Sequence, residues 1–194
     1  MSEYAFIHIP KNAGMSFKRT LKDNPKIKYF SHDVLFKNIE STKNIYVIRE
    51  PVDRFTSAFF YLKRYPKNIR KDFYKTPDEL VDALLNQDPR SLMFMKVHEH
   101  DHVINGKKIH TDWVFSKQSY WIHKPHRFLL YDNLDEEVIN LGKDLDIGLK
   151  MPKINVSKRI DFTYSEESLQ YLKLAYKSDF LLYNFVKESK NKIL

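Results

Sequence analysis

The sequence predicts an α/β fold of three layers, in which helices cover both faces of a mainly parallel sheet. Short runs rich in β-branched and aromatic residues alternate with amphipathic segments along the 194 residues. No internal repeat and no linker-like stretch interrupts this alternation, so we expect a single domain over residues 1–194. Ligands of such folds bind beyond the carboxyl ends of the strands.

The N-terminal third contains the first strand-to-helix units. An apolar run from Tyr4 to Ile9 is followed by a turn and by a helix-forming segment from Met15 to Leu21. Further strands are expected from Lys26 to Phe30 and from Asn44 to Ile48. Pro51 then suits the first turn of a helix. That helix is expected to bury four residues spaced three and four apart, Phe55, Ala58, Phe59 and Leu62.

The second half continues the same alternation. A capping box with Pro at the first helical position predicts a helix from Thr76 to about Leu85. A loop or irregular hairpin is expected from His98 to Trp113, a strand from Phe128 to Tyr131, and a helix from Leu134 to Leu145. Ser165 begins a long helix that is expected to pack on the core through Leu169, Leu172, Tyr176, Phe180 and Tyr183.

The composition restricts the classes of function. Cys is absent, which excludes disulfides, thiolate metal sites and cysteine nucleophiles. No segment has the pattern of a signal peptide or a membrane span, so we expect a soluble, cytoplasmic protein without a membrane partner. The 33 Lys and Arg against 25 Asp and Glu give a formal charge of +8, which favours an anionic ligand. The basic residues are spread out apart from the stretch from Lys63 to Lys71, and such a stretch is more often a solvated helix face and loop than a nucleic-acid footprint.

Two strand-to-helix junctions carry residues suited to binding anions. The first, Pro10 to Phe17, offers backbone N–H groups, the positive end of a helix and the charge of Lys11. The second begins with Arg49, which forms forked hydrogen bonds with phosphate, and includes Ser57 about two turns into the helix. A nucleoside with phosphate groups at both ends needs such a pair of sites. The first junction lacks the GxxxxGK[ST] spacing of nucleoside triphosphatases.

These junctions resemble a known enzyme family. PKNAGMSF, residues 10–17, resembles the 5′-phosphosulfate loop of sulfotransferases that use 3′-phosphoadenosine 5′-phosphosulfate (PAPS), and REPVDRFTSAF, residues 49–59, resembles their 3′-phosphate motif. The family includes many carbohydrate sulfotransferases of the Golgi, which have a transmembrane anchor. We expect no such anchor in this protein, because no segment of the sequence has the pattern of a membrane span. Many members also carry a His where Val114 stands. The likeness continues through Gln118-Ser119-Tyr120, Leu130-Tyr131-Asp132-Asn133-Leu134, Asn155-Val156-Ser157 and Asp179-Phe180.

The resemblance implies transfer of a sulfuryl group from PAPS to a hydroxyl, with a carbohydrate as the expected acceptor and no metal. Lys11 is expected to act catalytically by neutralising the bridging oxygen of the leaving nucleotide. A late loop, which includes Lys158, closes near the nucleotide in similar enzymes. The nucleotide-binding residues implied by the resemblance are Lys11, Asn12, Ala13, Gly14, Met15, Ser16, Phe17, Arg49, Ser57, Ser157 and Arg159.

The acceptor hydroxyl needs a general base, and His suits this role at neutral pH. His32 is the first candidate, because it follows a predicted strand and should emerge at the carboxyl edge of the sheet. Asp33 and His8 are the alternatives, although His8 alternates with apolar residues and also fits a hydrogen-bonded interior position. Arg54 has two open interpretations, a contact to the nucleotide and a structural brace.

Two other classes of function stay open. A module that binds nucleic acid or another polyanion would account for the positive charge, and a kinase-like phosphotransferase would account for the Lys11 loop. The run from His98 to His102 has a spacing that could chelate a metal on a strand, but a solvated polar loop is the stronger interpretation. We therefore expect no metal site.

Overall fold

A computed structural model of the protein describes residues 3–31, 43–65, 68, 70–96, 102–104, 107–109, 113–150 and 161–191. The chain divides into two compact units, each assembled from separate stretches of sequence. Unit 1 comprises Met1–Glu50, Trp121–Val156 and Tyr183–Leu194, and unit 2 comprises Pro51–Tyr120 and Ser157–Leu182. No helix within the described ranges is long and apolar enough to cross a membrane.

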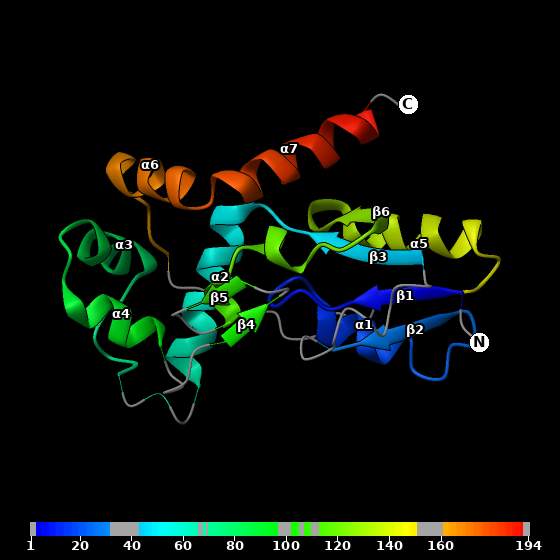
Figure 1. The fold of residues 1–194 in the computed structure, drawn as a ribbon, viewed down its shortest axis with the longest axis horizontal. Helices are drawn as coiled ribbons and strands as arrows, with labels where there is room; N and C mark the ends of the chain where they lie inside the picture. The colour runs from blue at the N-terminus through cyan, green and yellow to red at the C-terminus, as the bar shows by residue number, and fades with distance from the viewer. Residues whose placement is uncertain are drawn as a thin grey trace. The chain divides into compact units, whose positions relative to one another are not determined.

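Unit 1 contains a four-stranded sheet whose strands all run parallel (Figure 1). The strand order is β2 (Ile27–Phe30), β1 (Tyr4–Ile7), β3 (Lys43–Ile48) and β6 (Pro125–Leu130). The predicted α/β class with a parallel sheet is therefore confirmed. Because β1, β3 and β6 are neighbours, the residues that follow them meet at one edge of the sheet.

Helices α1 (Gly14–Thr20) and α5 (Leu134–Asp144) share one hydrophobic core with this sheet. The aromatic rings of Phe6 on β1 and Phe17 on α1 stack with their centroids 4.0 Å apart. Burial of an aromatic or aliphatic side chain of this size stabilises the fold by about 1.5–3 kcal/mol. The core consists of Phe6, Phe17, Leu21, Ile27, Ile45, Val47, Leu129, Val138, Leu141 and Leu149.

Unit 2 is built on helices α2 (Pro51–Arg64), α3 (Pro77–Leu85), α4 (Pro89–Met95) and α6 (Glu166–Ala175). Its core is rich in aromatic rings and includes the short 3₁₀ helix η2 (Trp113–Phe115). The four α2 residues predicted to be buried, Phe55, Ala58, Phe59 and Leu62, all lie in this core. A 3₁₀ helix, η3 (Gln118–Trp121), follows η2, and another, η4 (Tyr131–Asn133), follows β6.

The helix caps of unit 2 follow the sequence closely. The hydroxyl of Thr76 accepts the N–H of Glu79 at 3.2 Å, as a capping box predicts. The Glu79 carboxylate accepts the N–H of Lys75 rather than that of the cap residue itself. Ser165 caps α6 by accepting the N–H of Ser168, so this predicted helix start is also confirmed.

Three elements differ from the prediction or were not predicted. The long helix expected after Ser165 is wrong as a single helix, because it breaks at Tyr176 into α6 and α7 (Lys177–Asn191). The hydroxyl of Tyr176 donates to the carbonyl oxygen of Phe115 at 2.8 Å, which holds the break in place. Helix α4 was not predicted, and the expected irregular hairpin contains β4 (His102–Ile104) paired antiparallel with β5 (Lys107–Ile109).

Candidate functional site

The loop between β1 and α1 has an unusual backbone. Lys11 and Ala13 adopt left-handed conformations, with φ angles of 67° and 60°. For residues other than glycine this region costs roughly 1–2 kcal/mol per residue, so surrounding contacts must hold the loop. The two residues alternate with Asn12 and Gly14, which lie outside that region. Alternation between left- and right-handed residues turns successive N–H groups toward one side, and this concave arrangement suits an anion.

The amide groups of this loop are unevenly satisfied. The N–H groups of Ala13, Gly14 and Met15 have no acceptor within the described part of the chain. Helix α1 begins without a side-chain cap, because Ala13 has no polar side chain to supply one. Three consecutive donors are therefore available to a ligand at this turn.

The predicted site residues Met15, Ser16 and Phe17 differ in burial and in hydrogen bonding. The N–H groups of Ser16 and Phe17 both donate to the carbonyl oxygen of Ala13, at 3.0 and 3.1 Å. Ser16 can therefore offer a ligand its hydroxyl rather than its amide. The ring of Phe17 is fully buried in the core of unit 1, so its side chain contributes packing. Met15 is exposed on the surface of α1.

Two hydrogen bonds join the loop to β3 and to the residue after it. The amide nitrogen Nδ2 of Asn12, a buried residue, donates to the carbonyl oxygen of Val47 at 2.7 Å. The Nη1 of Arg49 donates to the carbonyl oxygen of Lys11 at 2.7 Å. The structure thus brings the first predicted junction and the leading residue of the second into direct contact.

Arg49 also contacts an aromatic ring that sequence reasoning did not assign to the site. Its guanidinium carbon lies 4.1 Å from the ring centroid of Tyr131, a cation–π contact. Tyr131 directly follows β6, the neighbour of β3 in the sheet. Its position at the end of a predicted strand was the signal that could have identified it. Arg49 is only 4% exposed, so both contacts are shielded from water.

The ring of His8 packs against Gly14 of the loop. The hydroxyl of Tyr29 on β2 lies 2.8 Å from Nδ1 of His8, within hydrogen-bonding distance. A Cβ atom on Gly14 would lie 1.8 to 2.2 Å from three atoms of the His8 ring, so the packing of this ring requires glycine at position 14. With 8% exposure and a polar partner, His8 is confirmed as a hydrogen-bonded interior residue.

No family model, curated protein or solved structure matches this chain. The site is therefore described by the fold and by the contacts of the loop. In unit 1 those contacts gather the loop around Lys11, Arg49 and Tyr131 at the carboxyl edge of the sheet.

The other residues of the second junction belong to unit 2. Ser57 is buried on α2. Arg54 is also buried, and its Nη1 donates to the carbonyl oxygen of Ser116 at 2.7 Å. This bond favours the structural interpretation of Arg54, as a brace between α2 and the segment that follows η2.

Several predicted residues lie outside the described part of the chain. They include two candidates for the general base, most of the histidine-rich run and the late loop, namely His32, Asp33, His98, His100, Asn155, Ser157, Lys158 and Arg159. Among the described residues, no three His, Asp or Glu side chains are grouped so that they could hold a metal.

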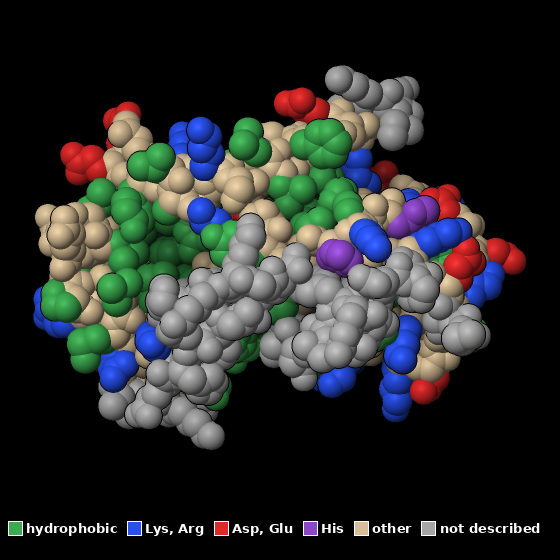
Figure 2. Space-filling model, in the orientation of Figure 1, with side chains coloured by type: hydrophobic (Ala, Val, Ile, Leu, Met, Phe, Trp, Pro, Cys, Tyr) green, Lys and Arg blue, Asp and Glu red, His purple; other side chains and the backbone are tan. Residues whose placement is uncertain are grey.

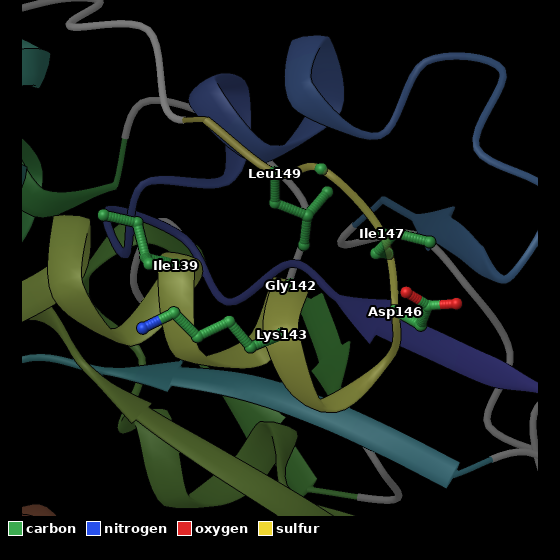
Figure 3. A pocket seen from close by; sticks show the side chains of 7 residues that line it. Ile139, Gly142, Lys143, Asp146, Ile147 and Leu149 are labelled. Atoms are coloured by element: carbon green, nitrogen blue, oxygen red, sulfur yellow. The ribbon is translucent and has the colours of Figure 1, made fainter.

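A hollow of about 360 Å³ lies elsewhere in unit 1, on α5 and the turn after it (Figure 3). Gly142 permits the chain to approach closely there, since a Cβ at this position would lie 2.7 Å from the carbonyl oxygen of Ile147. None of the predicted site residues lines the hollow. Its lining consists of Ile139, Gly142, Lys143, Asp146, Ile147, Gly148 and Leu149.

The charged side chains on the face drawn in Figure 2 are mixed in sign. Both Lys or Arg and Asp or Glu side chains of the described residues are visible on that face.

Proposed function

We propose that the protein is a PAPS-dependent sulfotransferase whose loop from Lys11 to Ser16 binds the 5′-phosphosulfate. The observation that carries the proposal is the contact between the two anion-type junctions, where Arg49 donates to the carbonyl oxygen of Lys11 at 2.7 Å. One turn thereby gathers a lysine, an arginine and three consecutive amides that have no acceptor among the described residues. The motif resemblance of the sequence supplies the identity of the nucleotide.

The proposed reaction is an in-line displacement at sulfur. A bond forms between sulfur and the acceptor oxygen as the bond from sulfur to the bridging oxygen of the nucleotide breaks, which leaves 3′-phosphoadenosine 5′-phosphate (PAP). Negative charge gathers on that bridging oxygen, and the Lys11 ammonium is proposed to neutralise it. The amides of Ala13, Gly14 and Met15 and the hydroxyl of Ser16 would stabilise the same charge as fixed donors.

The remaining roles follow from the resemblance. Arg49 and Ser57 are proposed to bind the 3′-phosphate, and Ser157 and Arg159 are proposed to bind the nucleotide as well. The general base is proposed to be His32, which accepts the proton of the acceptor hydroxyl. The acceptor is proposed to be a carbohydrate, and no metal is needed where Lys11 and the loop amides supply the positive charge.

Calorimetric titration with PAP in the absence of Mg²⁺ tests the donor half of the proposal. Wild-type protein should bind PAP, and Arg49→Ala should largely abolish binding. The matched control is Arg127→Ala, which removes an arginine of the same unit that pairs with Asp144. Absence of PAP binding to wild type would overturn the proposal. Salt-sensitive binding to duplex DNA or Mg²⁺-dependent binding of ATP would favour the alternatives.

Transfer of labelled sulfate from PAPS to a panel of glycans tests the acceptor half. Wild type should label at least one glycan, and His32→Ala should lose most of that activity while retaining its affinity for PAP. Full activity in His32→Ala would assign the base to another residue. PAP binding without transfer to any glycan would direct the search to protein, lipid or small-alcohol acceptors.

A further inference from the structure

We propose that Arg49 is a positioning residue for the Lys11 loop as well as a ligand of the 3′-phosphate, so that the two ends of the nucleotide bind cooperatively. This inference rests on the proposed function and deepens it. A guanidinium that served only the 3′-phosphate would need no contact with the loop that serves the 5′ end. In this protein the side chain proposed to bind the 3′-phosphate also donates to the carbonyl oxygen of Lys11 in that loop.

The bond from Arg49 falls on a critical peptide group. Its acceptor is the carbonyl oxygen of Lys11, the first of the two left-handed residues in the loop. Since residues other than glycine disfavour this conformation, the orientation of that peptide depends on what holds it. A guanidinium carries five N–H donors in one plane, so this type of side chain can bind more than one acceptor.

Tyr131 fixes the plane of the guanidinium. The ring lies 4.1 Å from the guanidinium carbon, and Arg49 is 4% exposed, so the side chain has little freedom to leave the loop. Lysine cannot reproduce this arrangement, because an ammonium neither stacks on a ring as a plane nor presents a fixed fork of donors. Arg49→Lys should therefore keep the charge and lose the brace.

A second bond shows that the loop is held from the same strand. Nδ2 of Asn12 donates to the carbonyl oxygen of Val47, two residues before Arg49. The carbonyl group of Lys11 is thus tied to the residue that follows β3, and the side chain of Asn12 is tied to β3 itself. A phosphate bound to Arg49 would hold the guanidinium in the orientation that supports Lys11, and this gives a physical route for coupling between the two ends.

The test compares two probes that differ only in the 3′-phosphate, PAP and adenosine 5′-monophosphate (AMP). Each is titrated into wild type, Arg49→Lys, Tyr131→Leu and the control Arg127→Lys, with binding followed by amide chemical shifts because AMP is expected to bind weakly. Arg49→Lys should weaken AMP binding about tenfold, although AMP has no 3′-phosphate, and Tyr131→Leu about threefold. The control should bind both probes as wild type does.

One result with the two probes would overturn the inference. If Arg49→Lys and Tyr131→Leu lose affinity for PAP but bind AMP within about twofold of wild type, Arg49 serves the 3′-phosphate alone and the inference is overturned. If wild type binds neither probe, the proposed function itself fails. The two failures are distinguishable because the first requires PAP binding by wild type.

Hydrogen exchange in the nucleotide-free protein gives a readout that does not depend on affinity. The N–H of Asn12 donates to the carbonyl oxygen of Ile9 at 3.2 Å, a bond that closes the turn next to Lys11. Its exchange should be about tenfold faster in Arg49→Lys if Arg49 braces the loop. Unchanged exchange at Asn12 would count against the brace even where PAP binding is lost.

Discussion

Two turns of the molecule present successive backbone N–H groups, and they differ in what those groups meet. In unit 2 the N–H groups of Gln118 and Ser119 donate to the carboxylate of Asp179, at 2.7 and 3.0 Å. In unit 1 the N–H groups from Ala13 to Met15 meet no acceptor in the described residues, and Lys11 lies beside them in the sequence. The turn at Gln118 binds a carboxylate of the chain itself, that of Asp179. The turn from Ala13 to Met15 has N–H donors with no such carboxylate among the described residues. The Lys11 loop is thus suited to an anion that comes from outside the chain.

Removal of the internal anion should have the largest effect. Asp179 is 0% exposed, so Asp179→Ala leaves one buried and one partly buried N–H group without their acceptor. Each such group costs about 1–3 kcal/mol, and we expect the free energy of unfolding in urea to fall by about 3 kcal/mol or more. The control is Asp78→Ala, whose partly exposed carboxylate accepts the N–H of Ser165 and should cost about 1 kcal/mol. Equal losses in the two variants would break the comparison.

Lys11→Ala should lower the rate of sulfuryl transfer strongly and the stability of the fold only weakly. Sulfuryl transfer should fall by about a hundredfold, since the variant lacks the charge that we propose neutralises the leaving oxygen. The free energy of unfolding should fall by less than it does in Asp179→Ala, because Lys11 is partly exposed whereas Asp179 is fully buried. Lys18→Ala, on the exposed surface of α1, is the matched control and should leave the rate unchanged. A loss of stability comparable to that of Asp179→Ala would make Lys11 a structural residue.

Gly14→Ala tests how tightly the loop is enclosed. The added methyl group would meet the His8 ring, so we expect a loss of about 2 kcal/mol in the free energy of unfolding. Gly148→Ala is the control, because a Cβ there meets no atom within 4 Å. Introducing Gly14→Ala into a His8→Ala background should cost much less than it does in wild type, since the clashing ring is gone. Additive costs in the double variant would show that the ring is not what excludes a side chain.

Alkaline pH should produce the smallest of these effects, through a hydroxyl of unit 1 that is fully hydrogen-bonded. Burial raises the pKa of Tyr46 to about 12, although the N–H of His123 donates to its oxygen at 3.1 Å and opposes the shift. Since the pKa of an unfolded tyrosine is about 10, the contribution of this proton to stability is complete below pH 10 and is lost between pH 10 and 12.

The loss due to Tyr46 should reach about 1.4 kcal/mol at pH 11. Urea unfolding of wild type and Tyr46→Phe at pH 8 and pH 11 measures it. The stability difference between the two proteins should shrink by that amount at the higher pH, because Phe has no proton to lose. A difference that is independent of pH would contradict the assignment to Tyr46.

Local signals predicted most of the fold correctly. The apolar runs identified the four parallel strands, and the caps at Thr76 and Ser165 located two helix starts. The same signal would have found α4, since Asp88 followed by Pro89 repeats the pattern of Thr76 and Pro77. The break at Tyr176 was missed because a tertiary hydrogen bond to Phe115 holds it, and helical periodicity continues across it.

The sequence predicted some residues of the candidate site and missed others. The motifs predicted Lys11 and Arg49 in the segments that follow neighbouring strands, and in the structure the two residues are in contact there. The partners Tyr29 and Tyr131 were not assigned to the site, since strand pairing rather than sequence distance brings them to it. The left-handed conformations of Lys11 and Ala13 could not be anticipated, because neither residue type favours them.

The contact between His8 and Gly14 limits how this sequence can diverge in evolution. A side chain at position 14 would occupy the space of the His8 ring, so neither position can change size alone without disturbing the loop. Homologous chains should therefore show paired substitutions, in which a residue larger than glycine at position 14 accompanies a residue smaller than histidine at position 8. Such covariation in homologous sequences would be evidence for the contact between these two residues, which are six positions apart in this chain.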